Sequence, residues 1–324
     1  PDSLGRSIVR KIREGGFQGR LALVNPHHAS IDDWPTVPHL AALDFIPDVV
    51  VIATPRETVP GLVQQAADLG AAAAVIITAG FAQDDPLAAE LREITRRTSI
   101  RVVGPNCLGL IAPRAHFDAS FAAKPALPGD LALISQSGAI ATAILEWAHA
   151  NKAGFSAVLS LGDKLDVDFA DCLDYFAQDR ATRAILLYIE DLTDARKFMS
   201  AARAAARVKP VLVVKAGRGR KRRATGLTHS SRLAAPDLVY EAAFRRAGLL
   251  RVYDLDELFA AAETLAHVTP FNGDRIGILT NGGGLGQLAV DRIVDLGGEI
   301  ATLSDETIAT LNARFGSDWS GTNP

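Results

Sequence analysis

The sequence contains little cysteine: only Cys107 and Cys172 occur among its 324 residues. This count excludes a disulfide scaffold and a cysteine-rich metal site, and it is typical of a reducing compartment such as the cytoplasm, where we expect this protein. The sequence also lacks any run of the roughly 20 apolar residues that a membrane-spanning helix needs, so we expect no membrane segment. We expect no secretory signal either, because no such pattern opens the chain.

The sequence has no marked excess of charge of either sign. Lys and Arg number 34 against 37 Asp and Glu, which gives a net charge of −3. A near-neutral balance argues against a nucleic acid or a membrane surface as partner. Apolar residues make up 48% and charged residues 22%, which is an ordinary globular composition, and the length suits about two domains or three.

Short apolar runs alternate with helical patterns along almost the whole sequence, which is typical of a parallel sheet covered by helices. In the first part, strands are predicted at 21–24, 49–52, 74–77 and 100–103, and helices at 59–69 and 86–98. After a break at 125–129, strands are predicted at 131–134, 157–160, 184–188 and 211–214, and helices at 138–150, 168–178, 194–206 and 236–247. A third start follows Pro270, with a strand at 275–279 and then a helix to about 295.

This pattern predicts an α/β protein with two Rossmann-like units and the beginning of a third. The sequence opens, without Met, on a helical pattern that includes Ile8 and Ile12, so the strand that normally precedes such a helix is missing. It ends in a loop at Pro324. We interpret the chain as a fragment, or a processed form, of something longer.

Three unusual loops follow predicted strands of the first unit: Thr54-Pro55, Thr78–Phe81 and Gly104–Gly109. Ligands of open parallel sheets bind at the carboxyl ends of the strands. Together these loops suit a nucleotide-like ligand. The alternative is that glycine and proline only mark turns there, and spacing alone leaves the two interpretations evenly balanced.

The segment Ser135–Ala139 follows a strand and opens a helix. Small residues at a helix N-terminus leave backbone N–H groups open to a phosphate. A serine nucleophile is a weaker interpretation, because the G-x-S-x-G pattern is not matched. A serine that only caps the helix is the alternative that the local sequence favours.

Two further residues are candidates for a histidine site. Glu190 ends a predicted strand, where a carboxylate is usually solvated but can orient an imidazole. His229 lies in a loop of small residues at 226–231, and a single loop histidine is more often a surface residue than a catalytic one. None of the histidines, including the pair His27 and His28, has the spacing of metal ligands.

Two other motifs are weaker candidates for a catalytic or binding site. The run Arg218–Arg223 holds five cations in six residues; it is normally a solvated loop, although it can attract phosphates, and it lacks the aromatics of a nucleic-acid site. The segment Thr280–Gly286 does not have the dinucleotide-binding spacing, which argues against a nicotinamide-dependent dehydrogenase.

Taken in order, a set of short motifs resembles the NDP-forming acyl-CoA synthetases, a superfamily that includes the succinyl-CoA synthetase α subunit. The resemblance runs through essentially the whole chain, and it is the order and spacing that make it specific. The motifs are Ala79–Phe81, Gly104–Gly109, Ser135–Gly138, Gly154–Ser156, Ser160–Asp163, Asp166–Asp168, Tyr188–Glu190, Lys209–Val211, Lys215–Arg218 and Tyr240–Gly248.

The resemblance implies a Rossmann-like CoA-binding domain at 1–124 with its first strand missing. A flavodoxin-like, doubly wound ligase domain with a phosphohistidine loop would follow at 125–269, and a truncated second flavodoxin-like domain at 270–324. It implies that His229 is phosphorylated, that Glu190 holds it, and that Ser137 and Gly138 receive the phosphoryl group. The implied CoA-binding residues are Ser3, Gly5, Thr54, Pro55, Ala79, Gly80, Phe81, Pro105 and Asn106.

The resemblance also implies a reaction in three steps. Phosphate attacks an acyl-CoA to give an acyl phosphate and CoA, His229 takes the phosphoryl group, and ADP receives it to become ATP. The last step needs an ATP-grasp domain or β subunit, which would bring the nucleotide and Mg²⁺ and which this sequence does not resemble. An oligomer, acyl-CoA and phosphate as ligands, and no bound metal in this part are further expectations.

The sequence departs from the family's pattern at the histidine, and part of it resembles a second group of proteins. The family usually has Ser-His-Thr-Gly around the histidine, whereas this chain has Thr228-His229-Ser230-Ser231, which puts the mobility of the loop in question. The stretch at about 154–303 also resembles the synthetase-like module of bacterial protein lysine acetyltransferases. That similarity keeps open an acyl-CoA-binding regulatory module as the alternative function.

Overall fold

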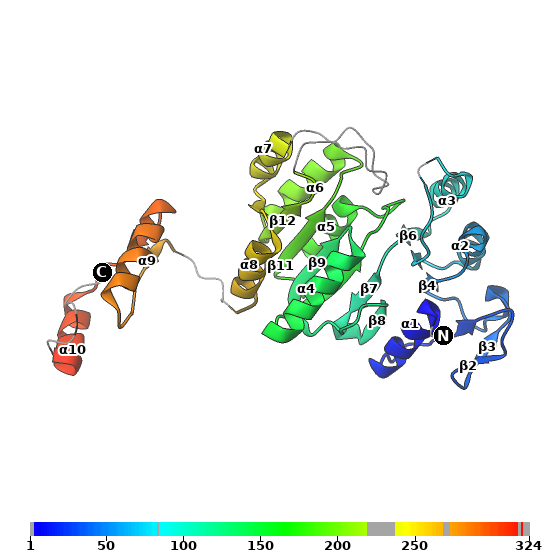
Figure 1. Cartoon of the computed structure of the whole chain (residues 1–324), viewed down its shortest axis with the longest axis horizontal. Coiled ribbons are helices and arrows are strands. Elements are labelled where there is room, and N and C mark those ends of the chain that lie inside the picture. Colours follow the sequence, from blue (N-terminus) through cyan, green and yellow to red (C-terminus); the bar gives the residue numbers. More distant parts are fainter. Residues whose placement is uncertain (1–2, 83, 219–236, 268–272, 317–318, 320–324) are drawn as a thin grey trace. The chain divides into compact units, whose positions relative to one another are not determined.

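The computed structural model describes residues 3–82, 84–218, 237–267, 273–316 and 319. The chain divides into two units, Pro1–Val268 and Thr269–Pro324 (Figure 1). The first unit contains a smaller and a larger α/β part, which are joined by hydrogen bonds and line a common cleft. The α/β class predicted from the sequence is confirmed.

The first part consists of short strands and three α-helices. Its helices are α1 (Leu4–Glu14), η1 (Leu40–Ala42), η2 (Arg56–Thr58), α2 (Val59–Leu69) and α3 (Pro86–Arg97). Its strands are β1 (Leu23–Val24), β2 (Ser30–Ile31), β3 (Trp34–Val37), β4 (Val49–Ile52), β5 (Ala73–Ile76) and β6 (Arg101–Val103). They form two three-stranded sheets, β1-β3-β2 and the parallel β4-β5-β6.

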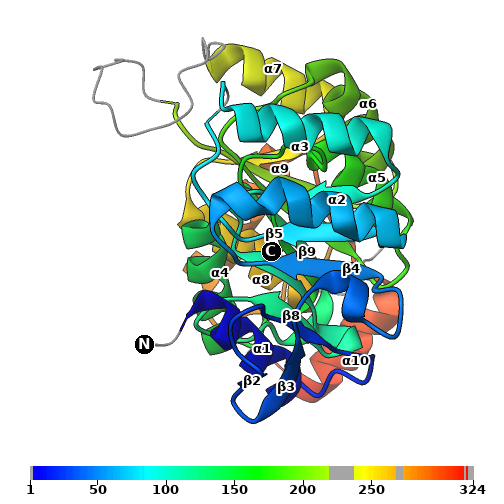
Figure 2. The same cartoon turned by 90° about the vertical axis from the view of Figure 1, so that its right-hand side faces the viewer.

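Alternation along β5 decides which helices cover each face of its sheet, because successive side chains of a strand point to opposite faces. Ala74 and Ile76 pack with residues of α2 and α3, and these two helices lie side by side (Figure 2). Val75 and Ile77 pack instead with Ile8 of α1. The sheet is therefore buried on both faces, which explains its nearly continuous apolar strands.

The larger part is built on a seven-stranded sheet in the order β13-β12-β11-β9-β10-β7-β8. Its strands are β7 (Gly109–Ala112), β8 (Phe117–Ser120), β9 (Pro128–Ser135), β10 (Phe155–Ser160), β11 (Ala184–Ile189), β12 (Val211–Lys215) and β13 (Leu250–Val252). Its helices are η3 (Pro113–Ala115), α4 (Gly138–Asn151), α5 (Phe169–Gln178), α6 (Ala195–Ala206), α7 (Asp237–Ala247) and α8 (Leu255–His267).

The five strands β9 to β13 run parallel, with helices on both faces. Ile185 and Leu187 of β11 pack with residues of α5, α6 and α7, whereas Leu186 packs with residues of α4 and α8. This alternation is that of a doubly wound sheet. Its predicted strands and helices are confirmed, with ends that differ by a few residues.

The hairpin of β7 and β8 is a feature that the sequence patterns did not predict. β7 pairs antiparallel with β10, at Ile111 with Val158 and Leu110 with Leu159, and β8 pairs with β7. The hairpin thus adds two strands to the five parallel ones, although its residues fall inside the range 1–124 that the resemblance assigned to the first domain. The domain boundary after residue 124 stays a prediction.

Main-chain hydrogen bonds join the two α/β parts along β6. The N–H of Val167 donates to the carbonyl of Val102 at 3.1 Å, and that of Leu165 to the carbonyl of Gly104 at 3.0 Å. In addition, one carboxylate oxygen of Asp166 accepts from the N–H of Val102 at 2.8 Å. The loop after β10 therefore continues the edge of the first part's sheet.

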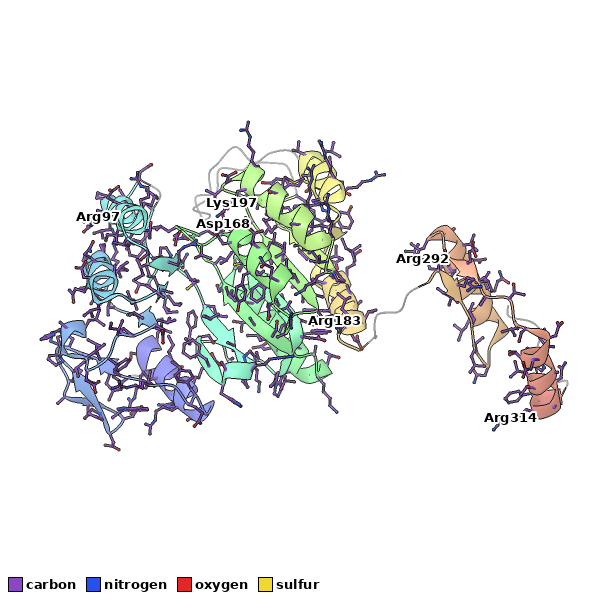
Figure 3. The ribbon with its side chains drawn as sticks, turned by 180° about the vertical axis from the view of Figure 1, so that it is seen from behind. Arg97, Asp168, Arg183, Lys197, Arg292 and Arg314 are labelled. Atoms are coloured by element: carbon purple, nitrogen blue, oxygen red, sulfur yellow. The ribbon has the colours of Figure 1, made fainter. Side chains whose placement is uncertain are left out.

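Ion pairs flank this connection. The guanidinium of Arg101 donates to Asp166 at 2.9 Å and lies 3.5 Å from a carboxylate oxygen of Asp171. Lys197 of α6 donates to Asp171 at 2.7 Å and to Asp168, the N-cap of α5, at 3.1 Å. Figure 3 shows Lys197 beside Asp168. Opposite charges thus alternate across the start of α5.

The second unit contains β14 (Arg275–Ile276), α9 (Gly283–Asp295), β15 (Glu299–Ile300) and α10 (Asp305–Phe315). β14 and β15 pair in parallel. The strand predicted at 275–279 is shorter in the structure, whereas the helix predicted to end near 295 is confirmed.

Candidate active site

A cleft of about 620 Å³ lies where the two α/β parts of the first unit meet. It collects residues from the start of α1, from the loops after the strands of the first part, from the two residues that flank the β7–β8 hairpin and from the first turns of α4. The lining residues are Leu4, Ala53, Thr54, Ile77, Thr78, Ala79, Asn106, Cys107, Leu108, Phe121, Gly138, Ala139 and Thr142. None of these described side chains is charged, so polarity in the cleft comes from hydroxyl, amide and main-chain groups.

Hydrogen bonds hold the three loops of the first part together at the cleft. The hydroxyl of Thr78 donates to the carbonyl of Thr54 at 2.7 Å. The N–H of Asn106 donates to the carbonyl of Thr78 at 3.0 Å. Gly104 has φ +95, and a Cβ there would lie 2.5 Å from the carbonyl oxygen of Ile76, so only glycine lets the third loop approach β5 this closely.

The N-terminus of α4 forms the opposite wall of the cleft. Ser137 is its N-cap, and its hydroxyl accepts from the N–H of Ile140 at 3.4 Å. The hydroxyl of Ser135 donates to the carbonyl of Ser137 at 2.7 Å, which fixes the turn before the helix. The positive end of the α4 dipole lies at Gly138 and Ala139, and no acidic residue occupies the first turn of this described helix. This end of the helix therefore suits an anion.

Glu190 lies at the end of β11, in the loop before α6. Its side chain still reaches solvent, but desolvation at the sheet edge raises the pKa of its carboxyl above the ordinary value. Lys164 opposes that shift, and Asp191 adds to it. A carboxylate with a raised pKa is a stronger hydrogen-bond acceptor than a fully solvated one.

The cleft brings together several residues that the sequence singled out. Thr54, Ala79, Asn106 and Gly138 line it. Ser3 and Ser137, the N-caps of α1 and α4, directly precede the lining residues Leu4 and Gly138. Gly5, Pro55, Gly80, Pro105 and Glu190 do not line it, and the ring of Phe81 is buried with the core residues between α2, α3 and their sheet. His229 lies outside the described residues.

Other lining residues were not in the implied CoA-binding set. Thr78, Cys107 and Leu108 nevertheless lie within the loops that the sequence marked for a ligand, and Ile77 directly precedes one of them. Phe121 and Thr142 carried no signal, because one enters through the unpredicted β7–β8 hairpin and the other through the second turn of a helix. Within the part of the chain that the structure describes, no group of three or more His, Cys, Asp or Glu side chains could hold a metal ion.

The class of protein follows from two family matches. Residues 1–113 match the CoA binding domain family, and residues 128–265 match the succinyl-CoA ligase like flavodoxin domain family. The first range contains the three hydrogen-bonded loops, and the second contains the N-terminus of α4 and Glu190. The fold and cleft are therefore those of a CoA-binding domain joined to a succinyl-CoA ligase-like domain.

Similar proteins narrow this class. The α subunits of the ADP-forming acetate–CoA ligases I and II of Pyrococcus furiosus are 36% and 33% identical to this chain, over 90% and 97% of its length and 65% and 69% of theirs. The structure of a dinucleotide-forming acetyl-coenzyme A synthetase 1 from Ca. Korarchaeum cryptofilum, in complex with phosphate and ADP, matches with a TM-score of 0.91. The two sequences are 30% identical, and the match covers 100% of this chain and 71% of the synthetase chain.

The chain belongs to the family of ADP-forming acetate–CoA ligases, within the NDP-forming acyl-CoA synthetase superfamily that its motifs resemble. It spans 65% of the length of one such α subunit, and 44% of the length of an ADP-forming acetate–CoA ligase from Methanocaldococcus jannaschii. These relatives are ligases, which supports the ligase interpretation over the acetyltransferase-associated module. No helix in the described ranges is both long and apolar enough to cross a membrane.

Proposed function

We propose that this chain is the α-like portion of an NDP-forming acyl-CoA synthetase, an acid–thiol ligase that converts acyl-CoA, phosphate and ADP into a carboxylate, CoA and ATP. The observation that carries the proposal is the cleft in which the strand-end loops of a CoA-binding domain face the N-terminus of α4. A thioester held by the loops would there meet a phosphate held by the helix. The boundaries 1–124, 125–269 and 270–324 remain part of this proposal.

In the first step, a phosphate oxygen attacks the carbonyl carbon of the thioester, and the carbon–sulfur bond breaks. CoA leaves as a thiolate that takes up a proton, and an acyl phosphate remains. Ser137, Gly138 and the positive end of the α4 dipole would stabilise the phosphate charge. The CoA would be held by Ser3, Gly5, Thr54, Pro55, Ala79, Gly80, Phe81, Pro105 and Asn106.

In the second step, an imidazole nitrogen of His229 attacks the phosphorus of the acyl phosphate. The bond from phosphorus to the acyl oxygen breaks, the carboxylate leaves, and a phosphohistidine forms. The carboxylate of Glu190 would accept the N–H of the other ring nitrogen and so hold the imidazole in one orientation. Its raised pKa, caused by desolvation, favours this acceptor role.

In the third step, a β-phosphate oxygen of ADP takes the phosphoryl group from His229. This step belongs to an ATP-grasp domain or β subunit, which would also bring the nucleotide and Mg²⁺. We propose that the active enzyme is an assembly of this chain with that partner. Cys107 and Cys172 are free, buried thiols, which suits a cytoplasmic enzyme.

The first two steps can be tested on this chain without the nucleotide partner. Incubation with acetyl-CoA and radiolabelled phosphate should give a base-stable, acid-labile label on the protein. His229→Ala should abolish the label, whereas His149→Ala, at an exposed position in the last turn of α4, should keep it. A label that survives in His229→Ala, or an unlabelled wild-type chain, would contradict the proposal.

A further inference from the structure

Side chains from three different strand ends bind the loop at Glu190 and Asp191. Gln136, between β9 and α4, accepts through Oε1 from the N–H of Glu190 at 3.0 Å and from that of Asp191 at 3.1 Å. Lys215, the last residue of β12, donates from Nζ to the carbonyl oxygen of Glu190 at 2.8 Å. Lys164, in the loop after β10, donates to the carboxylate of Asp191 at 2.6 Å. Both main-chain polar groups of Glu190 are therefore fixed.

Gln136 links the loop at Glu190 and Asp191 to the N-terminus of α4, the wall of the cleft where we propose that phosphate binds. Its Nε2 donates to the carboxylate of Asp191 at 3.0 Å, and its own N–H donates to the carbonyl of Tyr188 at 3.0 Å. The two N–H donors and the one carboxylate acceptor settle the orientation of the amide, because only its oxygen can face N–H groups. Gln136 directly precedes Ser137, the N-cap of α4.

The two lysines that complete this arrangement are buried. The side chain of Lys164 is 3% exposed, and Lys215 is 6% exposed. Nζ of Lys215 also donates to the carbonyl of Ala216 at 2.6 Å and lies 4.5 Å from the centre of the Tyr240 ring. Since a buried ammonium group is costly unless its partners stay in place, these contacts favour a single geometry of the loop.

We propose that Gln136 is a positioning residue, which fixes the carboxylate of Glu190 relative to the N-terminus of α4. In the proposed function, Glu190 orients the imidazole that attacks the phosphoryl group, so the position of its carboxylate would set the rate of phosphohistidine formation. This inference rests on the proposed function. A displacement of about 1 Å at a reacting centre can cost about 100-fold in rate, whereas Gln136 does not line the described cleft, so its loss should leave acyl-CoA binding intact.

The test compares three variants with the wild-type chain. Gln136→Ala removes all side-chain hydrogen bonds of the amide. Gln136→Glu keeps an acceptor for the two N–H groups but sets a second carboxylate against Asp191. Gln178→Ala is the matched control, because this exposed glutamine only donates to the carbonyl of Asp174 in its own helix, at 3.2 Å.

Two quantities are measured for each variant: the rate of phosphohistidine formation from acetyl-CoA and labelled phosphate, and the dissociation constant of acetyl-CoA by calorimetry. We expect Gln136→Ala to lower the rate by roughly 10- to 100-fold and to change the dissociation constant by less than about twofold. Gln178→Ala should change neither.

The pH profile of labelling adds a readout that a merely structural residue would not move. The described charged groups that act on Glu190 are Lys164, Asp191, Lys215 and Asp163. The additional anion of Gln136→Glu lies beside them and disfavours ionisation of Glu190. The acid limb of the labelling rate should therefore move to higher pH in Gln136→Glu and stay in place in Gln178→Ala.

The outcomes distinguish a failure of the positioning role of Gln136 from a failure of the proposed ligase function. An unlabelled wild-type chain would overturn both. A wild-type chain that is labelled at His229, together with a Gln136→Ala variant that is labelled equally fast, would overturn only the positioning role. The role would also be overturned if Gln136→Ala lost acetyl-CoA affinity as strongly as labelling rate, or if the pH profile of Gln136→Glu did not move.

Discussion

Asp166 ties the CoA-binding part of this chain to the flavodoxin-like part through one carboxylate oxygen, so Asp166→Ala should weaken the connection. That oxygen accepts from the main-chain N–H of Val102 at 2.8 Å and from the guanidinium of Arg101 at 2.9 Å. Val102 is fully buried in the core of the first part. Its N–H would therefore lose its acceptor in a place that water reaches poorly.

The two hydrogen bonds differ in expected magnitude. A buried N–H left without a partner costs about 1–3 kcal/mol. The side chain of Arg101 is 50% exposed, and an exposed ion pair contributes about 0–1 kcal/mol. Asp166→Ala should thus destabilise the fold by about 2–3 kcal/mol, and Arg101→Ala, which leaves the carboxylate on Val102, by about 1 kcal/mol or less.

Thermal unfolding followed by circular dichroism measures this difference. With about 2–4 °C per kcal/mol for a folded region of this size, Asp166→Ala should lower the Tm by roughly 5–10 °C and Arg101→Ala by no more than about 4 °C. Acetyl-CoA titration should show weaker binding for Asp166→Ala, since the cleft lies between the two parts. Equal destabilisation by the two variants would refute the reasoning.

Two further predictions concern the wall of the cleft at Ser137 and the two buried cysteines. Ser137→Asp should leave the Tm nearly unchanged, because aspartate caps helices as well as serine does. Its charge should repel phosphate, however, and raise the KM for phosphate in the labelling assay by about tenfold or more. Ser304→Asp, at the N-cap of α10, should leave this KM unchanged, and an unchanged KM in Ser137→Asp would argue against phosphate at the N-terminus of α4. Burial raises the pKa of the Cys107 thiol to about 12 and also raises the pKa of Cys172, so almost none of either thiol is ionised at pH 8. Ellman's reagent should therefore react with neither thiol in the native protein and with both after unfolding; rapid reaction of the native protein would contradict the burial.

Local patterns predicted those strands and helices whose apolar pattern is complete within one segment. The apolar run Val49–Ile52 and the pattern at 59–69 predicted β4 and α2 with their observed ends. A strand covered on both faces reads as continuous apolar sequence, and an amphipathic helix shows its period within one segment. The motifs in order indicated the family, and the loops that follow these strands indicated where a ligand binds.

Local patterns failed where a short element depends on a distant partner. β7 and β8 each have only four residues, and they exist as strands because β7 pairs with β10. The same holds for β2 and β13, which have two and three residues. The sequence patterns also missed the helix α8. The strand predicted at 275–279 extended further than β14, because an apolar run shows hydrophobicity but not how many of its residues find a hydrogen-bonded neighbour.

The sequence by itself determined the α/β class, the family and the segments that carry its motifs, since these depend on the kind and spacing of residues along the chain. Only the tertiary structure decided that Phe121 and Thr142 line the cleft, and that the amide of Gln136 holds the N–H groups of Glu190 and Asp191. Gln136 and Glu190 are 54 positions apart. Their contact arises because β9 and β11 lie next to each other in the sheet, and no local periodicity encodes the order of strands.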